Sequence, residues 1–222
     1  LDLIKIYEDA SESFYNDNKN KGQKSKHWKR YDFKKFNLDN LKNFRSKGNL
    51  SEGLDEGNTG KNFSFNIFAD IVRETSEDYL INNLPKKNIG NCDSFIEYKN
   101  IFIDYNKLIH IYWFWILEKE VLKKDKISNI CEIGGGYGSL SELFLKNYNS
   151  KVFLIDLPEA NLMSTYYLKE TFPEKNFFLF NKYQKTKKLS YEDFVKNDII
   201  ILPPNCKIDK KIKFDFFINT RS

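Results

Sequence analysis

The chain has 222 residues, enough for one large domain or two small ones. Aromatic residues make up 16% of the sequence, so a sizeable core is available, and the formal net charge of +5 is modest. Lysines are spread along the chain rather than gathered in one tail, which favours a solvated surface over a nucleic-acid interface. We therefore expect a globular protein that does not bind nucleic acid.

The cysteines and the apolar stretches indicate the compartment. Three cysteines, Cys92, Cys131 and Cys206, are far apart and odd in number, so neither a disulfide framework nor a paired-cysteine metal site is expected. The longest apolar stretch, from Leu108 to Leu117, is shorter than the about 20 residues that a membrane helix needs. No secretory leader is visible. We expect a cytoplasmic protein with no membrane span and no metal.

The first half of the chain has mainly helical spacing. Apolar residues such as Leu3, Ile4 and Tyr7 share one face of a predicted helix. The glycine-rich stretch 48–60 predicts a loop, and helices or helix pairs are expected over 63–84 and 94–124. We therefore expect residues 1–124 to form a helical region that contributes to substrate binding or acts as a lid.

From residue 128 the pattern changes to an alternation of apolar strands and helices. A strand at 129–133 is followed by a helix at 139–147, with Ser139 as its cap, and then by a strand at 152–155. A second helix is expected from Pro158 to about Phe172. Such alternation is typical of a Rossmann-like α/β domain with a parallel sheet, here over residues 125–222.

Two later segments compete for the place of the third strand in this sheet. Both 177–180 and 199–202 read as strands, and we favour 199–202, which leaves 181–197 as an insertion. The fourth strand is expected at 214–218. The chain starts with Leu1 and stops just after that strand, where a doubly wound sheet would continue. We therefore expect the sequence to be a fragment that lacks C-terminal strands.

A glycine-rich turn joins the first strand to its helix and carries the strongest functional signal. Gly134, Gly136 and Gly138 alternate with other residues, and the acidic Glu132 lies just before them. Glycine reaches positive φ without steric cost and lets the backbone approach a ligand closely. The helix that follows presents free N–H groups to an anionic group. The segment therefore predicts a cofactor site.

The spacing of the glycines and a second acid indicate the kind of cofactor. A dinucleotide-binding turn, G-x-G-x-x-G, would place its third glycine where this chain has Ser139. Asp156 ends the second strand about 20 residues after the turn, where an acid accepts hydrogen bonds from ribose hydroxyls. The arrangement favours a nucleoside cofactor other than a nicotinamide dinucleotide.

The pattern Glu-x-Gly-x-Gly-x-Gly resembles the first motif of class I S-adenosylmethionine-dependent methyltransferases, and Asp156-Leu157-Pro158 resembles their second motif. The resemblance implies that the turn lies against the methionine part of S-adenosylmethionine, with Gly135 at a variable position. It also implies that Asp156 binds the ribose and that Leu157 flanks the adenine. The implied cofactor-binding residues are Glu132, Gly134, Gly135, Gly136, Gly138, Asp156 and Leu157.

The last residues of the chain narrow the expected reaction. Amino-directed methyltransferases often have proline after the asparagine that follows the fourth strand, whereas Asn219 is followed here by Thr220. Taken together, the motifs resemble those of the sugar O-methyltransferase family, which implies methyl transfer to a sugar or glycan hydroxyl. Three alternatives stay open. The acceptor could instead be a phenolic or other natural-product hydroxyl, the protein could be a non-catalytic binding protein of the same fold, or it could be a nicotinamide oxidoreductase.

No sequence feature fixes the catalytic base that a hydroxyl acceptor needs. The chain has two histidines, His27 and His110, and His110 lies in an apolar stretch that is typical of a core helix. The carboxylates of Asp70, Glu74 and Asp104 are further candidates. The base could also lie in the C-terminal part that we expect to be missing, and the catalytic residue therefore stays open.

Overall fold

The computed structural model of the chain describes residues 2–17, 36–46, 61–93, 95–122 and 127–220. The chain divides into two units. The sheet unit contains residues 1–37 and 126–222, and the hairpin unit contains residues 38–125. In this division the first helix, within the expected helical region 1–124, lies in the same unit as residues 126–222 of the segment 125–222 expected to form the cofactor domain.

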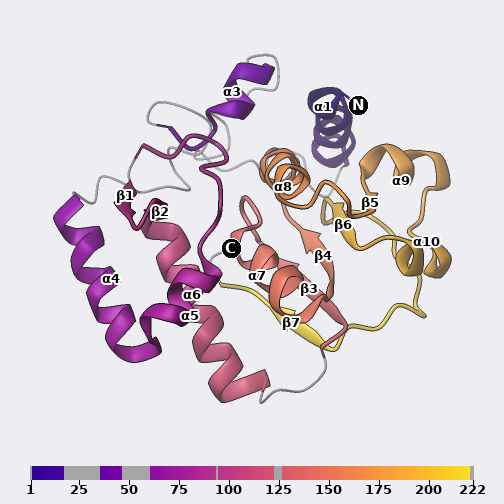
Figure 1. The fold of residues 1–222 in the computed structure, drawn as a ribbon. Coiled ribbons are helices and arrows are strands. Elements are labelled where there is room, and N and C mark those ends of the chain that lie inside the picture. Colours follow the sequence, from indigo (N-terminus) through magenta and orange to yellow (C-terminus); the bar gives the residue numbers. More distant parts are fainter. Residues whose placement is uncertain (1, 18–35, 47–60, 94, 123–126, 221–222) are drawn as a thin grey trace. The chain divides into compact units, whose positions relative to one another are not determined.

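A five-stranded parallel sheet forms the centre of the sheet unit (Figure 1). Its spatial order is β5-β6-β4-β3-β7. After β3 and β4 the chain passes to β5 at the edge of the sheet, returns to form β6 between β5 and β4, and then crosses to the other side of β3 to form β7, so the strand order reverses between β3 and β7. In order along the chain, the strands are β3 (Asn129–Ile133), β4 (Lys151–Ile155), β5 (Phe177–Phe178), β6 (Ile199–Leu202) and β7 (Phe216–Ile218).

Helices follow the strands as the alternating pattern predicts. They are α7 (Ser139–Tyr148), α8 (Pro158–Thr171), α9 (Phe180–Thr186) and α10 (Tyr191–Lys196). One face of the sheet packs Phe153 and Ile200 against Phe194 of α10. The strand interiors are buried because a parallel sheet is covered on both faces. The result is an α/β unit compatible with a Rossmann-like fold.

The structure confirms the predicted strands at 129–133, 152–155 and 199–202 and corrects the segments around them. Both competing segments are strands, since β5 adds an outer strand next to β6, and residues 181–197 include α9 and α10. The fourth strand is shorter than expected, because it begins at Phe216. Gly138, rather than Ser139, is the residue at the cap position of α7, and its φ of +88° is one that glycine adopts without strain.

The first helix, α1 (Leu3–Tyr15), packs along α8 (Figure 1). Its buried side chains recur at helical spacing on one face: Ile6, Tyr7, Ala10 and Phe14. The hydroxyls of Tyr7 and Thr165 share a hydrogen bond of 2.5 Å between α1 and α8. This buried contact explains why the first helix belongs to the sheet unit.

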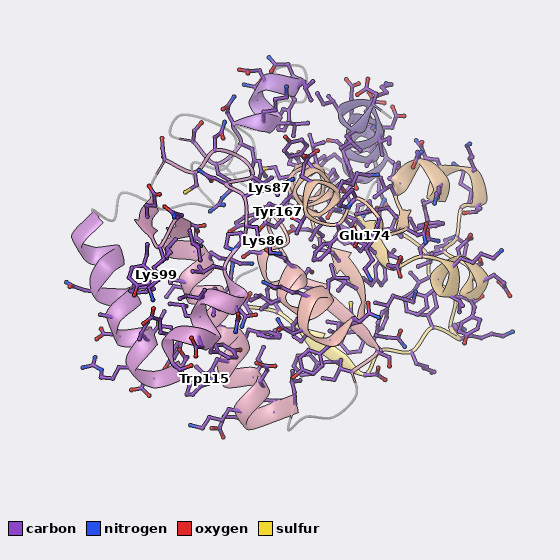
Figure 2. The ribbon with its side chains drawn as sticks, viewed as in Figure 1. Lys86, Lys87, Lys99, Trp115, Tyr167 and Glu174 are labelled. Carbon is purple, nitrogen blue, oxygen red and sulfur yellow. The ribbon has the colours of Figure 1, made fainter. Side chains whose placement is uncertain are left out.

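The hairpin unit contains a β-hairpin where the sequence predicted the start of a helix pair. The turn between its strands is Lys99-Asn100, with φ of +51° and +62°. Lys99, labelled in Figure 2, lies beside Glu77, and Tyr98 donates a 2.8 Å hydrogen bond to the Glu77 carboxylate. The elements of this unit are α3 (Leu38–Lys42), α4 (Lys61–Thr75), α5 (Glu77–Asn83), β1 (Phe95–Tyr98), β2 (Ile101–Asp104), α6 (Tyr105–Ile116) and the π-helix η2 (Leu117–Leu122).

A buried ion pair anchors the start of α6. One carboxylate oxygen of Asp104 lies 2.7 Å from a guanidinium nitrogen of Arg45, and the other accepts a 2.8 Å hydrogen bond from the Lys107 amide. Asp104 therefore caps α6 while holding the segment around Arg45 in place. Across the described residues, no helix has the length and apolar character that crossing a membrane requires.

Candidate functional site

The glycine turn lies at the carboxyl end of β3, where the strand order reverses. In open α/β sheets, ligands bind at this kind of position. The φ angles of Gly134, Gly136 and Gly138 are +72°, +57° and +88°, so the three spaced glycines all adopt left-handed backbone conformations. The Gly138 amide donates a 2.9 Å hydrogen bond to the Gly135 carbonyl, which closes the turn before α7 begins.

Two neighbouring glycines in this turn serve opposite purposes. A Cβ atom at Gly135 would lie 2.9 Å from Leu154 and 3.0 Å from the carboxyl carbon of Glu132, so packing excludes a side chain there. At Gly136 a Cβ atom would meet nothing within 4 Å. The family resemblance implies a variable position at Gly135, but in this chain its environment is the crowded one. Gly136 borders open space beside the turn.

Asp156 connects the end of β4 to the glycine turn. Its carboxylate accepts a 2.8 Å hydrogen bond from the Gly136 amide and a 2.7 Å hydrogen bond from the Leu157 amide. The Gly134 amide donates to the Ile155 carbonyl at 2.8 Å, so the turn is fastened to β4 at two points. Asp156 and the glycines, predicted from separate parts of the sequence, therefore meet at one site.

The surroundings of Asp156 make its negative charge costly. The pKa of Asp156 is raised to about 6, mainly because the carboxylate is buried; the amide hydrogen bonds from Gly136 and Leu157 act to lower this pKa, and the charge of Glu159 acts to raise it. Asp156 forms no ion pair with any cation among the described residues. A ligand that donates hydrogen bonds to this carboxylate would stabilise its ionised form.

Glu132 lies beneath the turn rather than at its surface. Only 3% of Glu132 is exposed, and its carboxylate accepts a hydrogen bond from the Ser141 hydroxyl on α7. Burial, followed by the charge of Glu132, raises the pKa of the adjacent Cys131 thiol to about 12, so Cys131 is not a nucleophile at neutral pH. Glu132 therefore supports the glycine turn from below.

A buried aromatic pair supports the turn from the side of α8. The ring of Tyr137, within the turn, is edge to face with that of Tyr167, with centroids 5.0 Å apart; Tyr167 is labelled in Figure 2. The Tyr167 hydroxyl donates to Glu142 of α7 at 2.5 Å. A Cβ atom at Gly138 would meet Leu168 at 3.1 Å, so α8 also packs directly on the turn. This surrounding network holds the backbone amides of the turn in fixed positions.

Leu157 occupies the junction between Asp156 and α8. It is the residue before the first turn of the helix, and Pro158 follows it at the first helical position, as the sequence predicts. The Asn161 side chain donates a 2.8 Å hydrogen bond to the Asp156 carbonyl, so the junction is held from within α8 as well. Sequence reasoning did not single out Asn161, because a lone asparagine in a helix carries no distinctive signal.

Four of the five candidate bases named from the sequence lie in the hairpin unit. Asp70 and Glu74 are exposed on α4, and His110 packs against Trp113 on α6, with ring centroids 5.3 Å apart. Asp104 is a weak base: burial acts to raise its pKa, but the charge and hydrogen bond of Arg45 hold that pKa below its ordinary value. His27 lies outside the described residues. No group of three His, Cys, Asp or Glu side chains suited to a metal occurs among the residues described.

Three features lie together at the carboxyl ends of β3 and β4. Open space borders the backbone at Gly136, a carboxylate stands at the end of the neighbouring strand, and a buried carboxylate lies beneath the turn. Comparison with protein families gives no match for this chain, and comparisons with curated proteins and solved structures give none either. The interpretation of the site therefore depends on its residues and their geometry.

Proposed function

We propose that the protein is an S-adenosylmethionine-dependent methyltransferase of class I that transfers a methyl group to a hydroxyl, with a sugar or glycan as the acceptor. One observation carries the proposal: the Asp156 carboxylate is hydrogen-bonded to the Gly136 amide, at the point where the strand order reverses. This contact brings together the two motifs that resemble those of class I methyltransferases. The order of β6, β4, β3 and β7 is compatible with that fold.

The residues present fit S-adenosylmethionine. A carboxylate oxygen accepts more than one hydrogen bond, so Asp156 would bind the ribose hydroxyls and still hold the amides of Gly136 and Leu157. The absent side chain at Gly136 would leave room for the amino-acid part of the cofactor. The charge of Glu132, in its buried position, favours the cationic end of the ligand. The bound cofactor would supply an electrophilic methyl group on its sulfonium.

The protein's own contribution to the reaction would be mainly orientation. Methyl transfer needs the acceptor oxygen, the methyl carbon and the sulfur in line, and fixed orientation supplies much of the rate. The glycine turn suits this task because the Gly134 and Gly136 amides are bonded to Ile155 and Asp156 at the end of β4, and α8 packs against Gly138. The base that activates the acceptor hydroxyl stays open, because no candidate among the described residues of the sheet unit stands out.

Binding of the cofactor is the first test. We expect the wild-type protein to bind S-adenosylmethionine and S-adenosylhomocysteine in isothermal titration calorimetry. Gly136→Val should abolish binding, because a branched side chain would fill the open space beside the turn. Asn149→Val is the matched control, since Asn149 also has a positive φ, +48°, but ends α7 away from the turn. A lack of wild-type binding at millimolar cofactor overturns the proposal, as does displacement of the cofactor by a nicotinamide dinucleotide.

The acceptor is the second test. Purified protein and methyl-labelled cofactor are incubated with matched panels of sugars, glycans and phenols, and transferred label is counted. Transfer to a sugar or glycan hydroxyl is the expected result. Transfer confined to phenols or other natural products would replace the acceptor class while keeping the enzyme class. Tight cofactor binding without transfer to any panel member would favour the non-catalytic alternative.

A further inference from the structure

Exposed lysines from two segments of the chain gather in one part of the sheet unit. The first segment is the end of α9 with the residues that follow it, and the second is the loop between β6 and β7. The sequence alone does not reveal this grouping, because α10 and β6 separate the two segments. We call the exposed residues the lysine cluster: Lys185, Lys187, Lys188, Lys207, Lys210 and Lys211.

Backbone pairing holds the two segments of the lysine cluster side by side. Leu189 and Ile208 form a parallel bridge outside the central sheet. The Leu189 amide donates a 2.9 Å hydrogen bond to the Lys207 carbonyl, and the Asp209 amide donates one of 2.9 Å to the Leu189 carbonyl. The Leu189 side chain is part of the buried core, together with that of Phe153. The cluster therefore stands on a fixed backbone.

The lysine cluster encloses one acidic residue. One carboxylate oxygen of Asp209 lies 2.7 Å from the Lys188 Nζ, and the other accepts a 2.9 Å hydrogen bond from the Lys211 amide. Glu192 and Asp193 follow the first segment, in the first turn of α10. Six lysines and Asp209 together carry a formal charge of +5, which equals the net charge of the whole chain. The remainder of the chain is therefore formally neutral.

The chemistry of the lysine cluster suits a diffuse anionic surface better than a nucleic acid. Arginine, whose planar fork matches single phosphate groups, is absent from residues 127–220. Bases need aromatic rings on which to stack. The neighbouring Tyr183 is already engaged, because its ring stacks on Phe180 with centroids 5.7 Å apart and its hydroxyl accepts a hydrogen bond from the Lys207 amide. Ile208, by contrast, is 39% exposed within the cluster.

We propose that the lysine cluster and Ile208 form a docking surface for a lipid bilayer that contains anionic headgroups. The ammonium groups would lie among the headgroups, and Ile208 would enter the boundary between headgroups and acyl chains. Long lysine stems let the charges follow mobile headgroups while the stems cover apolar surface. Such peripheral contact requires no membrane-spanning helix. It goes beyond the proposed methyl transfer and does not depend on it.

Vesicle sedimentation tests the docking surface. The purified protein is incubated with vesicles of phosphatidylcholine alone, or of phosphatidylcholine mixed with phosphatidylserine. We expect sedimentation with the anionic vesicles only. Binding should weaken as the ionic strength is raised above about 0.15 M, where charges are screened within about 8 Å. A DNA duplex and an acidic polysaccharide are offered as competitors at the same ionic strength.

Two matched pairs of substitutions separate the cluster from the overall charge. Lys187→Gln combined with Lys210→Gln removes two charges from the cluster, and at about fivefold in affinity per lysine the pair should bind anionic vesicles about 25-fold more weakly. Lys86→Gln combined with Lys87→Gln makes the same change of net charge at exposed lysines of the hairpin unit, which are labelled in Figure 2. This control pair should leave the affinity almost unchanged. Ile208→Gln should weaken binding several-fold.

Each outcome supports or overturns the proposal. Absence of sedimentation with anionic vesicles would overturn it, as would equal losses in the two lysine pairs. Full affinity of Ile208→Gln would also count against a bilayer, since a soluble polyanion needs no aliphatic contact. Tighter binding to DNA or to the polysaccharide than to the vesicles would replace the bilayer as partner. Thermal unfolding of every variant checks that the fold is kept, and a failure of cofactor binding would reject the proposed function alone.

Discussion

Two tight turns in this protein use positive φ in different ways. The hairpin turn between β1 and β2 places Lys99 and Asn100 at φ of +51° and +62°, and the turn after β3 places glycines at similar angles. In the hairpin, side chains make the contacts, since Lys99 and Tyr98 both reach Glu77. In the glycine turn, backbone amides make them. The comparison shows that a positive φ alone does not require glycine in this protein. In the turn after β3, glycine is also needed because a side chain would occupy space that the turn leaves to other groups.

The largest effect on stability should come from Gly135, the crowded member of the turn. Gly135→Ala places a methyl group 2.9 Å from Leu154 and 3.0 Å from Glu132, both in the buried layer. We expect the free energy of unfolding to fall by roughly 2–3 kcal/mol, the upper range for overpacking. Gly136→Ala makes no close contact and brings only the strain of a side chain at positive φ, so it should lower the free energy of unfolding by about 1 kcal/mol. Urea unfolding of both variants measures the difference, and equal losses would remove the distinction between the two glycines.

The next effect concerns the acid that fastens the turn. Asp156→Ala should weaken cofactor binding by roughly 1–3 kcal/mol, because the ribose hydroxyls lose a charged partner. The same variant leaves the amides of Gly136 and Leu157 without their acceptor, so hydrogen exchange at these amides should also accelerate. Calorimetry and exchange mass spectrometry measure the two effects. Unaltered affinity together with faster exchange would make Asp156 a structural residue only.

A smaller effect is expected from pH. Because the pKa of Asp156 is about 6, cofactor affinity should fall about tenfold for each pH unit below 6, as the carboxylate takes up a proton. The contribution of Asp156 to the stability of the free protein has the opposite sign. Its folded pKa lies above the ordinary 3.8, so the free energy of unfolding should rise as pH falls from about 6 toward 4. Calorimetry and urea unfolding across this range test both directions, and a flat affinity profile would contradict the assignment.

The smallest effect tests the hairpin side of the comparison. Asn100→Gly supplies the residue favoured at the second central position of a hairpin turn in which both residues have positive φ. We expect the free energy of unfolding to rise by about 0.5 kcal/mol, because a side chain at such a φ angle is destabilising by a similar amount relative to glycine. Thermal unfolding measures it, with the exposed Glu97→Gln variant as a control on the neighbouring strand. A loss of stability would show that the asparagine side chain contributes more than its backbone preference.

The sheet and the residues of the site were predictable because their signals are local. Short apolar runs mark β3, β4 and β6, and the spaced glycines follow directly after the first of them. The meeting of Asp156 with the turn followed from a general property of parallel sheets, whose strand ends lie at one edge. The prediction of these residues did not require knowing which distant strands pair with each other.

The remaining features depend on contacts that local patterns do not encode. The hairpin at 95–104 has the aromatic and β-branched residues of strands, but its Lys99-Asn100 turn lacks the glycine that marks most such turns. The crowding at Gly135 arises from Leu154 on another strand. The hydrogen bond from Tyr15 to Glu159 joins residues 144 positions apart in the sequence. Apolar spacing predicts a face of α1 but does not identify the helix that covers it.

The distance between α1 and its partner helix has a consequence during protein synthesis. Tyr7 and Thr165 are 158 positions apart. At a ribosomal rate of about 5–20 residues per second, roughly 8–30 seconds therefore pass between the synthesis of α1 and that of α8. Throughout that interval the side chains of Ile6, Ala10 and Phe14 lack the surface that later buries them. A nascent chain stalled before α8 therefore exposes an apolar helix of the kind that chaperones bind, whereas β3 and β4 are made within a few seconds of each other.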